Sequence, residues 1–213
     1  MSDVRSGLFI TLEGIDGCGK STQAKLLGSR LTSLGCAIEA LRDPGGTAVS
    51  EEIRRILLST DNHISPISEL LLYEAARAQM VSEKIKPWLE EGKVVILDRF
   101  YDSTTAYQGY GRGIDLTQIS RANQIASQGV VPDLTILIDM DWEVARSRRA
   151  SNTDDRMEKE GRDFFDKIRR GYEMIAQNEP DRVRFYDGNQ SVEALASQIW
   201  PAVEELISLR HLL

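Results

Sequence analysis

The sequence contains little cysteine and no long apolar run. Only two cysteines, Cys18 and Cys36, occur in the chain, and their spacing matches no zinc site. So few cysteines exclude a disulfide scaffold and favour a reducing compartment. No window reaches the about 18 consecutive apolar residues that cross a bilayer, and the first apolar stretch is too short for a signal peptide. We therefore expect a cytoplasmic protein without a membrane partner.

The sequence also has no excess of positive charge. It contains 26 lysine and arginine residues against 33 aspartate and glutamate residues, which gives a net charge of −7. General nucleic-acid binders present a basic face to the phosphates, so no nucleic-acid partner is expected. A small anionic substrate needs only a local basic pocket, and this class of ligand is therefore not excluded.

The length and the hydrophobic content fit one large domain. A chain of 213 residues with 41% hydrophobic side chains can bury a substantial core. The sequence contains no internal repeat and no low-complexity segment. We expect a single domain over 1–213, with at most a small mobile insertion.

Apolar runs alternate with helical patterns along the chain. The runs at 94–97 and 134–138 are continuously apolar apart from Thr135, which is typical of strands in a parallel sheet covered by helices. The predicted strands are 8–12, 36–41, 94–97, 134–138 and 183–186. The predicted helices are 20–34, a helix capped by Thr47 that ends near Leu58, a long helix from Ser65-Pro66 that Pro87 kinks or ends, 142–149, 162–177 and 192–209. This alternation predicts an α/β fold with a parallel sheet.

A glycine-rich segment between the first strand and the first helix carries the strongest motif. It reads GIDGCGKS and satisfies G-x-x-x-x-G-K-[ST], the P-loop that cradles phosphates with backbone N–H groups at a helix N-terminus. Lys20 is expected to reach the β- and γ-phosphates, and the Ser21 hydroxyl is expected to bind Mg²⁺. The predicted ATP-binding residues are Gly14, Ile15, Asp16, Gly17, Cys18, Gly19, Lys20, Ser21 and Thr22.

The P-loop by itself indicates only a nucleoside triphosphate. The sequence has no [NT]-K-x-D segment, which is the guanine-reading motif of GTPases. The loop also contains an acid, Asp16, whose charge would repel the γ-phosphate unless it serves a metal or a hydroxyl of a second substrate. These two features favour a kinase with an acceptor site next to the loop.

An acid and a base follow the apolar run at 94–97. Ligands bind at the carboxyl ends of strands in open α/β sheets, so Asp98 and Arg99 are candidates for that edge. Asp98 can complete the Mg²⁺ shell, and the fork of Arg99 matches phosphate oxygens. Taken alone, the pair could also be a structural ion pair at the end of a strand.

Six segments together resemble bacterial thymidylate kinases. They read LEGIDGCGKST, RDPGGT, YEAARAQ, DRFYDSTTAYQGYGRG, PDLTILID and DRMEKEGRDFFDKIRRGY, and they extend from Leu12 to Tyr172. The resemblance implies a P-loop NTPase fold with three layers, in which helices flank a five-stranded parallel sheet. It also implies ATP with Mg²⁺, dTMP as acceptor, dTDP as product and a homodimer formed by helix packing.

The resemblance assigns residues to the sugar and phosphate of the acceptor. Asp16 matches the acid that faces the 3′-hydroxyl of dTMP, and Arg42 and Arg99 match the arginines at its phosphate. Tyr107 matches a tyrosine near the sugar that disfavours a 2′-hydroxyl. Asp43 stands where glutamate is common in relatives, and the shorter acid can change how this turn holds Arg42.

Other matching residues belong to the base. Tyr73 falls on the aromatic that stacks on thymine, where many relatives have Phe, and Arg77 falls on the residue that reads the base edge. Their spacing of four puts both on one helix face, where a ring and a guanidinium can hold one base. Ser103 and Thr104 match polar residues that approach the base. From the pattern alone, packing aromatics are the simple alternative for Tyr73 and Tyr107.

The basic segment at about 146–162 is predicted to be a lid. An arginine from a closing segment would stabilise the charge that develops in phosphoryl transfer, and the P-loop has none of its own. Related lids often read R-x-R-G-x-x-D-R, whereas Ser151 stands at the second arginine position here. Arg149 is our first choice for the catalytic arginine and Arg156 our second. A solvated charged surface is the simple alternative for any single residue.

The predicted reaction is in-line transfer to a phosphate oxygen of dTMP, without a general base. Catalysis then consists of positioning and charge neutralisation by Lys20, Mg²⁺, Arg99 and a lid arginine. A kinase for another nucleoside monophosphate or for deoxynucleosides is the nearest alternative. A P-loop switch or an ATP-gated binding module is the alternative from another class, and it would hydrolyse ATP slowly without an acceptor.

Overall fold

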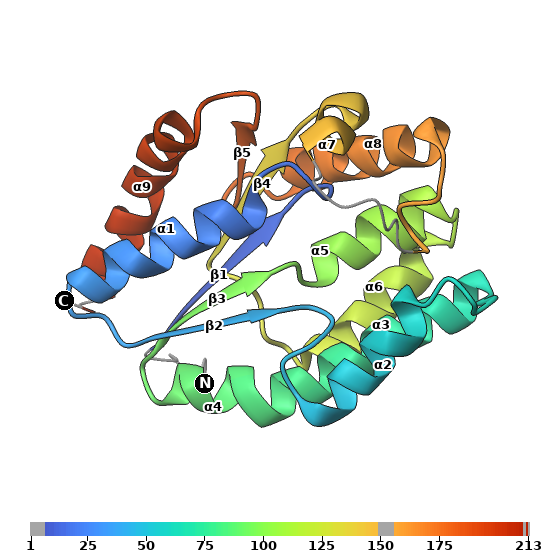
Figure 1. Ribbon diagram of the computed structural model, residues 1–213. Helices are drawn as coiled ribbons and strands as arrows, with labels where there is room; N and C mark the ends of the chain where they lie inside the picture. Colours follow the sequence, from blue (N-terminus) through green and yellow to red (C-terminus); the bar gives the residue numbers. More distant parts are fainter. Residues whose placement is uncertain (1–6, 149–155, 211, 213) are drawn as a thin grey trace.

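The computed structural model describes residues 7–148, 156–210 and 212. Their strands form one sheet with the order β2-β3-β1-β4-β5, and every pair is parallel (Figure 1). The strands are β1 (Leu8–Glu13), β2 (Ile38–Arg42), β3 (Val94–Asp98), β4 (Leu134–Asp139) and β5 (Val183–Asp187). The predicted five-stranded parallel sheet is confirmed.

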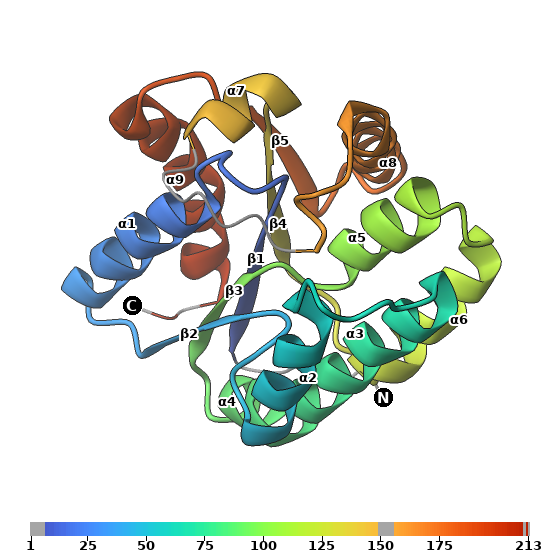
Figure 2. The same ribbon diagram turned by 45° about the vertical axis from the view of Figure 1, so that its right-hand side comes forward.

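Helices connect the strands and cover both faces of the sheet. The helical elements are α1 (Lys20–Ser33), α2 (Ala48–Leu58), α3 (Pro66–Met80), the π-helical turn η1 (Val81–Ile85), α4 (Lys86–Glu90), α5 (Tyr101–Thr104), the π-helix η2 (Thr105–Gly111), α6 (Leu116–Ser127), α7 (Trp142–Arg148), α8 (Arg162–Asn178) and α9 (Val192–Leu209). Helices α1 and α9 lie side by side on one face, whereas α4 and α8 lie on the other (Figures 1 and 2).

The central strands are hydrophobic on both sides because helices cover both faces. In β1, Leu8, Ile10 and Leu12 join the core that includes Leu27 of α1, whereas Phe9 packs in a second cluster that includes Met80 and Leu89. All of β1 is buried. Continuous apolar runs of this kind are the pattern expected of parallel strands.

The register brings the carboxyl ends of the strands to one edge of the sheet. Leu12 lies beside Asp98, Arg42 also lies beside Asp98, and Glu13 pairs with Leu137. The P-loop leaves β1 at this edge and leads into α1. Both features predicted for this edge, the P-loop and the Asp98–Arg99 pair, therefore lie there.

The sequence located most of the helices and their start signals. Thr47 caps α2 by accepting a hydrogen bond from Ser50 N, and Ser65 caps α3 with Pro66 as the first helical residue. The prediction that Pro87 ends or kinks the helix is incomplete, because the hydrogen-bond pattern changes earlier, at η1, and α4 continues to Glu90. In a π-helical turn the backbone hydrogen bonds span five residues and not four. This turn ends shortly before Pro87, which has no N–H to donate to the preceding turn.

The sequence did not predict α5, η2 or α6. Asp115 is the N-cap of α6, and its carboxylate accepts from Thr117 N and Gln118 N, so a cap signal was present in the sequence. In the described parts of the chain, no helix combines the length and the apolar character that a membrane crossing requires.

Candidate active site

A pocket of about 290 Å³ opens at the carboxyl edge of the sheet. It collects side chains from the P-loop, the ends of β2 and β3, helices α2 and α3, and the α5–η2 segment. Every residue predicted for the acceptor site lines it, together with both predicted metal ligands: Asp16, Ser21, Arg42, Tyr73, Arg77, Asp98, Arg99, Ser103, Thr104 and Tyr107.

The P-loop takes its shape from glycines at positions that a side chain cannot occupy. Gly14 has φ +133°, and a Cβ there would lie 2.3 Å from the carbonyl oxygen of Ile138. The loop curls around Lys20, whose Nζ donates to the carbonyl oxygens of Gly14 (2.9 Å) and Ile15 (3.0 Å). This ammonium, which is buried with its side chain only 5% exposed, is the cation that the motif assigns to the triphosphate.

Ser21 and Asp98 meet next to the loop. The Ser21 hydroxyl donates to Asp98 Oδ2 over 2.8 Å, so the first residues of α1 and the end of β3 share one point. In the described residues no group of three or more His, Cys, Asp or Glu side chains could hold a metal by itself. A hydroxyl and one carboxylate fit a site for Mg²⁺ that completes its shell with phosphate oxygens and water.

Asp16 links the P-loop to Arg99. Its Oδ1 accepts from Arg99 Nη2 at 2.8 Å and lies 3.4 Å from Lys20 Nζ. Burial alone would raise the pKa of Asp16, but the charges of Arg99 and Lys20 outweigh it and hold this pKa well below the usual range. Asp16 is therefore a carboxylate at neutral pH, placed between the loop and the acceptor pocket.

Arg99 has an unusual backbone conformation, and both of its terminal nitrogens, Nη1 and Nη2, donate hydrogen bonds. Its φ of +71° is in the left-handed region, which non-glycine residues rarely adopt. Nη1 donates to Ser103 Oγ (3.0 Å) and Tyr172 OH (3.3 Å), and Nη2 also donates to Tyr107 OH (3.3 Å). Such a strained position is maintained by its surroundings and is typical of functional sites.

Arg77 is buried among acidic and polar groups at the base of the pocket. It donates from Nε to Asp43 (2.6 Å), from Nη1 to Glu74 (2.7 Å) and from Nη2 to Thr104 Oγ1 (2.9 Å). Burial opposes its charge, but Asp43 and Glu74 more than compensate and raise the pKa of Arg77 above its ordinary value. The guanidinium is therefore held in place by contacts from three segments.

Arg42, in the turn RDPGGT, is held by Glu51, a residue that the sequence analysis did not single out. Arg42 Nη2 lies 3.2 Å from Glu51 Oε2, and Glu51 also accepts from Gly46 N. Asp43 binds Arg77 and not Arg42. The shorter acid in this turn thus acts on the arginine of α3, and Arg42 itself is half exposed at the mouth of the pocket.

The two tyrosines predicted from the resemblance both reach the pocket. Tyr73 is half-buried on α3 one turn before Arg77, as their spacing predicted. Tyr107 is almost fully buried on η2, and the guanidinium of Arg99 lies over its ring at 5.1 Å. Burial raises the pKa of Tyr107, although the charge of Arg99 opposes the shift, so its hydroxyl stays neutral.

Comparison with known proteins agrees with this geometry. The family model of thymidylate kinase matches residues 12–199. The chain belongs to the thymidylate kinase family. A thymidylate kinase from Thermoanaerobacter sp. (strain X514) is 47% identical over 94% of this chain and 99% of its own, and one from Pelobacter propionicus is 49% identical over 91% and 92%. A crystal structure of thymidylate kinase from Ehrlichia chaffeensis matches with a TM-score of 0.78 and 33% identity, covering 93% of this chain and 98% of that one.

Of the two lid arginines considered for catalysis in this thymidylate kinase family member, only one can be placed. Arg149 lies outside the described residues. Arg156 donates from Nε to Leu57 O (2.9 Å) and from Nη1 to Glu69 (2.5 Å), so it contacts α2 and α3 and not the P-loop. Its catalytic role stays a prediction, and in this structure it joins the end of the segment to the wall of the pocket.

Glu69 is the centre of that wall and was missed from the sequence. Its carboxylate is completely buried, and it accepts from Gln108 (2.8 Å) as well as from Arg112 and Arg156. Glu69 lies one turn before Tyr73 on α3, a spacing of four that the sequence displays. One carboxylate thus connects α3, η2 and Arg156 of the predicted lid segment.

Other pocket residues also went unnoticed in the sequence. Arg54 of α2 adds a further guanidinium to the pocket, and it donates to Pro44 O at 3.0 Å. Met157 and Leu58 supply apolar surface. Tyr172, which lies in the last segment that resembles the family, reaches Arg99 from α8.

Proposed function

We propose that this chain transfers the γ-phosphoryl group of ATP to a phosphate oxygen of dTMP and releases dTDP and ADP. The observation that carries the proposal is one pocket of about 290 Å³, next to the P-loop, that is lined by Arg42, Arg54 and Arg99 together with Tyr73. Arginine forks suit a phosphate, and an aromatic ring suits a planar base. Membership of the thymidylate kinase family supports the choice of acceptor.

In the proposed mechanism, the described residues position two phosphates and neutralise their charge. Lys20 and the P-loop N–H groups bind the donor, and Arg99 binds the acceptor phosphate. Asp16 faces the 3′-hydroxyl and, through its ion pair with Arg99, keeps the donor and acceptor sites in register. Ser21 and Asp98 would hold Mg²⁺, which supplies charge neutralisation between the phosphates when it is bound. A phosphate oxygen is already a nucleophile, so no general base is needed.

Specificity for thymine is assigned to the far end of the pocket. Tyr73 would stack on the base, while Arg77, Ser103 and Thr104 provide polar groups along its edge. The buried Tyr107 would lie near the sugar and disfavour a 2′-hydroxyl. Support for these roles comes from the shared pocket and from the fixed side chains of Arg77 and Tyr107.

The segment at 146–162 is the proposed lid of a single domain that spans 1–213. Its described end contributes Met157 to the acceptor pocket and ties Arg156 to Glu69. Closing over ATP would exclude water and limit hydrolysis without an acceptor. A lid arginine would then add positive charge to the transferring phosphoryl group.

Replacement of Arg149 by alanine tests the lid arginine. We expect kcat to fall by roughly 10³-fold, because an arginine that acts in the transition state is typically worth that much, while the KM for ATP changes little. Steady-state kinetics with dTMP give both values. Arg156→Ala is the matched comparison, because it removes the second candidate arginine from the same segment. A near-normal kcat for Arg149→Ala would remove this residue from the mechanism.

A homodimer is proposed to form through α2, α3 and α6. These helices pack side by side, and they expose Ile56, Ile67, Leu71 and Ile125, with Leu71 60% and Ile125 77% exposed. Apolar side chains gathered on neighbouring helices are typical of a subunit interface. Sedimentation equilibrium should give about twice the chain mass of 23.9 kDa. The substitution Leu71→Glu should reduce the measured mass to that of the monomer. A monomer at micromolar concentration would contradict the proposal.

An acceptor panel tests the proposed function. ADP release from ATP and Mg²⁺ is measured with dTMP, dUMP, UMP, CMP, AMP, GMP and thymidine. We expect dTMP to be turned over by far the fastest. Faster turnover of thymidine would identify a nucleoside kinase. Faster turnover of another nucleotide would contradict the roles assigned to Tyr73 and Arg77. Equal ADP release with and without an acceptor would leave only the assignment of the P-loop to ATP.

A further inference from the structure

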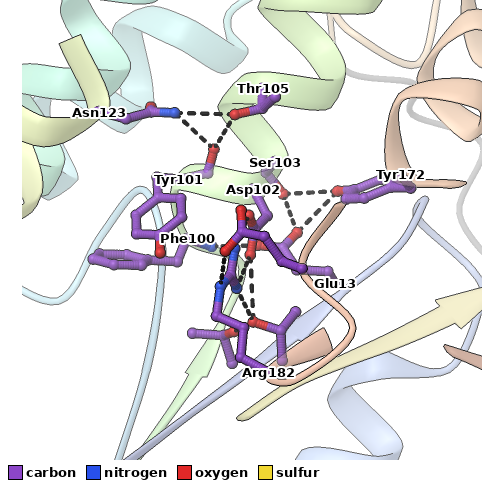
Figure 3. A network of polar contacts seen from close by, with 12 residues as sticks. Glu13, Phe100, Tyr101, Asp102, Ser103, Thr105, Asn123, Tyr172 and Arg182 are labelled. Atoms are coloured by element: carbon purple, nitrogen blue, oxygen red, sulfur yellow. Dashed lines mark hydrogen bonds and ion pairs between the residues drawn. The ribbon is translucent and has the colours of Figure 1, made fainter. Parts of the chain in front are cut away.

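A buried carboxylate lies directly behind Arg99. Glu13 is the last residue of β1, precedes the first glycine of the P-loop and is completely buried. Three donors surround it: Phe100 N (2.7 Å), Ser103 Oγ (2.5 Å) and Tyr172 OH (2.9 Å) (Figure 3). These groups come from the loop after β3, from α5 and from α8, so one carboxylate gathers three segments.

Two of the three donors also contact Arg99. Ser103 Oγ and Tyr172 OH each accept from Arg99 Nη1, at 3.0 and 3.3 Å. A hydroxyl carries one proton and two lone pairs, so it can donate to the carboxylate and accept from the guanidinium at the same time. The negative charge of Glu13 is thereby relayed to Arg99 through two hydroxyls, without a direct contact.

The third donor acts on the backbone of the same residue. Phe100 N follows Arg99, whose φ of +71° is unfavourable for a side chain with a Cβ. The hydrogen bond from Phe100 N to Glu13 Oε1 fixes the peptide plane after this strained position. Glu13 therefore constrains both the backbone and the guanidinium of Arg99.

The neighbouring buried acid has a different partner. Asp102 receives two hydrogen bonds from Arg182, at 2.7 and 2.8 Å, and forms a compensated ion pair (Figure 3). For Glu13, by contrast, the described residues place no Lys or Arg nitrogen within hydrogen-bond distance. Burial and the charge of Asp102 raise the pKa of Glu13, while the charge of Arg99 and the bonds from Ser103 and Phe100 N oppose this increase, and the net pKa is about 7. Arg99 is thus a cation whose charge acts on Glu13 and offsets part of the increase.

We propose that Glu13 is a positioning residue that sets the Arg99 guanidinium for the acceptor phosphate through the hydroxyls of Ser103 and Tyr172. The inference rests on the proposed function, because it assigns Arg99 to that phosphate. On its other side Arg99 is held by Asp16 of the P-loop. The guanidinium is therefore fixed between two carboxylates that flank the start of the P-loop. Ser103, which the resemblance assigned to the base, has its hydroxyl engaged in this relay.

The first test is Glu13→Gln, which keeps the size of the side chain but removes its charge. The amide oxygen can still accept from Phe100 N, whereas the amide NH₂ donates where the two hydroxyls donated before. We expect kcat/KM for dTMP to fall by about 10- to 100-fold, as is usual when the support of a functional group is removed, and the KM for ATP to stay within about twofold. Thr11→Val is the matched control, because Thr11 is equally buried on β1 and bonds to Thr135 (2.8 Å) away from Arg99.

A cycle with Arg99→Ala separates positioning from a general structural role. If Glu13 acts through Arg99, Glu13→Gln has less than a twofold effect on turnover in the Arg99→Ala background. The same fold-loss in both backgrounds, or wild-type kinetics for Glu13→Gln alone, would overturn the proposal. Should Glu13→Gln fail to fold, Ser103→Ala combined with Tyr172→Phe cuts the relay while it leaves the bond to Phe100 N intact, and it is expected to give a similar loss.

A structural readout keeps this inference separate from the proposed function. Turnover of dTMP by the wild-type protein tests the function, and crystal structures of Glu13→Gln and the wild type test the relay. We expect the Arg99 guanidinium to leave the hydroxyls of Ser103 and Tyr172 in the variant while the P-loop is unchanged. An unmoved guanidinium would refute the relay, whatever acceptor the protein uses.

Discussion

Arg99→Ala is expected to lower kcat/KM for dTMP by about 10³-fold, with a much smaller change in the KM for ATP. The guanidinium is the group that connects Asp16, Tyr107, Ser103 and Tyr172 at the acceptor end of the pocket. Its loss removes the charge that is proposed to neutralise the acceptor phosphate, and charge neutralisation of this kind is typically among the largest contributions in phosphoryl transfer. Steady-state kinetics with each substrate varied in turn measure the effect.

Arg99→Gly provides the control for the backbone. A glycine relieves the strain at φ +71°, whereas alanine keeps it, so the glycine variant should be more stable than the alanine variant by about 1 kcal/mol. Both variants should lose activity to the same extent, because both lack the guanidinium. Activity retained in either variant would show that Arg99 does not bind the acceptor phosphate.

Arg77→Met is expected to cost about 3–5 kcal/mol of unfolding free energy and also to raise the KM for dTMP at least tenfold. The substitution leaves Asp43 and Glu74 buried without their cation, which is the costly way to break a buried ion pair. It also removes the guanidinium from the base end of the pocket. Chemical denaturation measures the first effect, and initial rates with dTMP measure the second.

A triple variant separates the two roles of Arg77. Arg77→Met combined with Asp43→Asn and Glu74→Gln has no uncompensated charge, so it should regain a large part of the lost stability. Binding of dTMP should remain weak if Arg77 reads the base as proposed, because its guanidinium is still missing. If the triple variant also regains a normal KM for dTMP, Arg77 serves the fold and takes no part in recognition.

The sequence predicted the framework because its signals are local. The P-loop between 8–12 and 20–34 and the apolar runs that end at Asp98 and Asp139 each need only a few adjacent residues. From these runs follow the parallel sheet and the edge at which the pocket opens. The cap at Thr47 and the start at Ser65-Pro66 are local in the same sense, and both lie as expected.

The supporting residues could not be predicted because their partners are distant in the chain. Glu13 and Tyr172 are 159 positions apart, and Glu69 and Arg156 are 87 apart, yet each pair shares a hydrogen bond. A buried glutamate at the end of an apolar strand has no sequence pattern that tells whether it binds a metal, a substrate or another side chain. The π-helix η2 is also invisible in the sequence, because its apolar spacing does not differ clearly from that of an α-helix.

Arg99 and Arg77 also show what the sequence alone could not predict. Residue type and its place after an apolar run suggested phosphate binding for Arg99, and the resemblance to thymidylate kinases implied base recognition for Arg77. Only the fold shows that Arg99 adopts a left-handed backbone conformation and that Arg77 is almost completely buried between two acids. Both arginines are thus fixed before any substrate is present, which lowers the entropic cost of binding dTMP.

The most direct test follows the phosphoryl group itself. The wild-type protein is incubated with Mg²⁺, dTMP and ATP labelled in the γ-phosphoryl group, and the labelled products are separated. The account predicts that the label appears in dTDP in a one-to-one ratio with ADP, and that it disappears from dTDP in Arg99→Ala. Label released as inorganic phosphate at the same rate with and without dTMP would contradict direct transfer at this pocket.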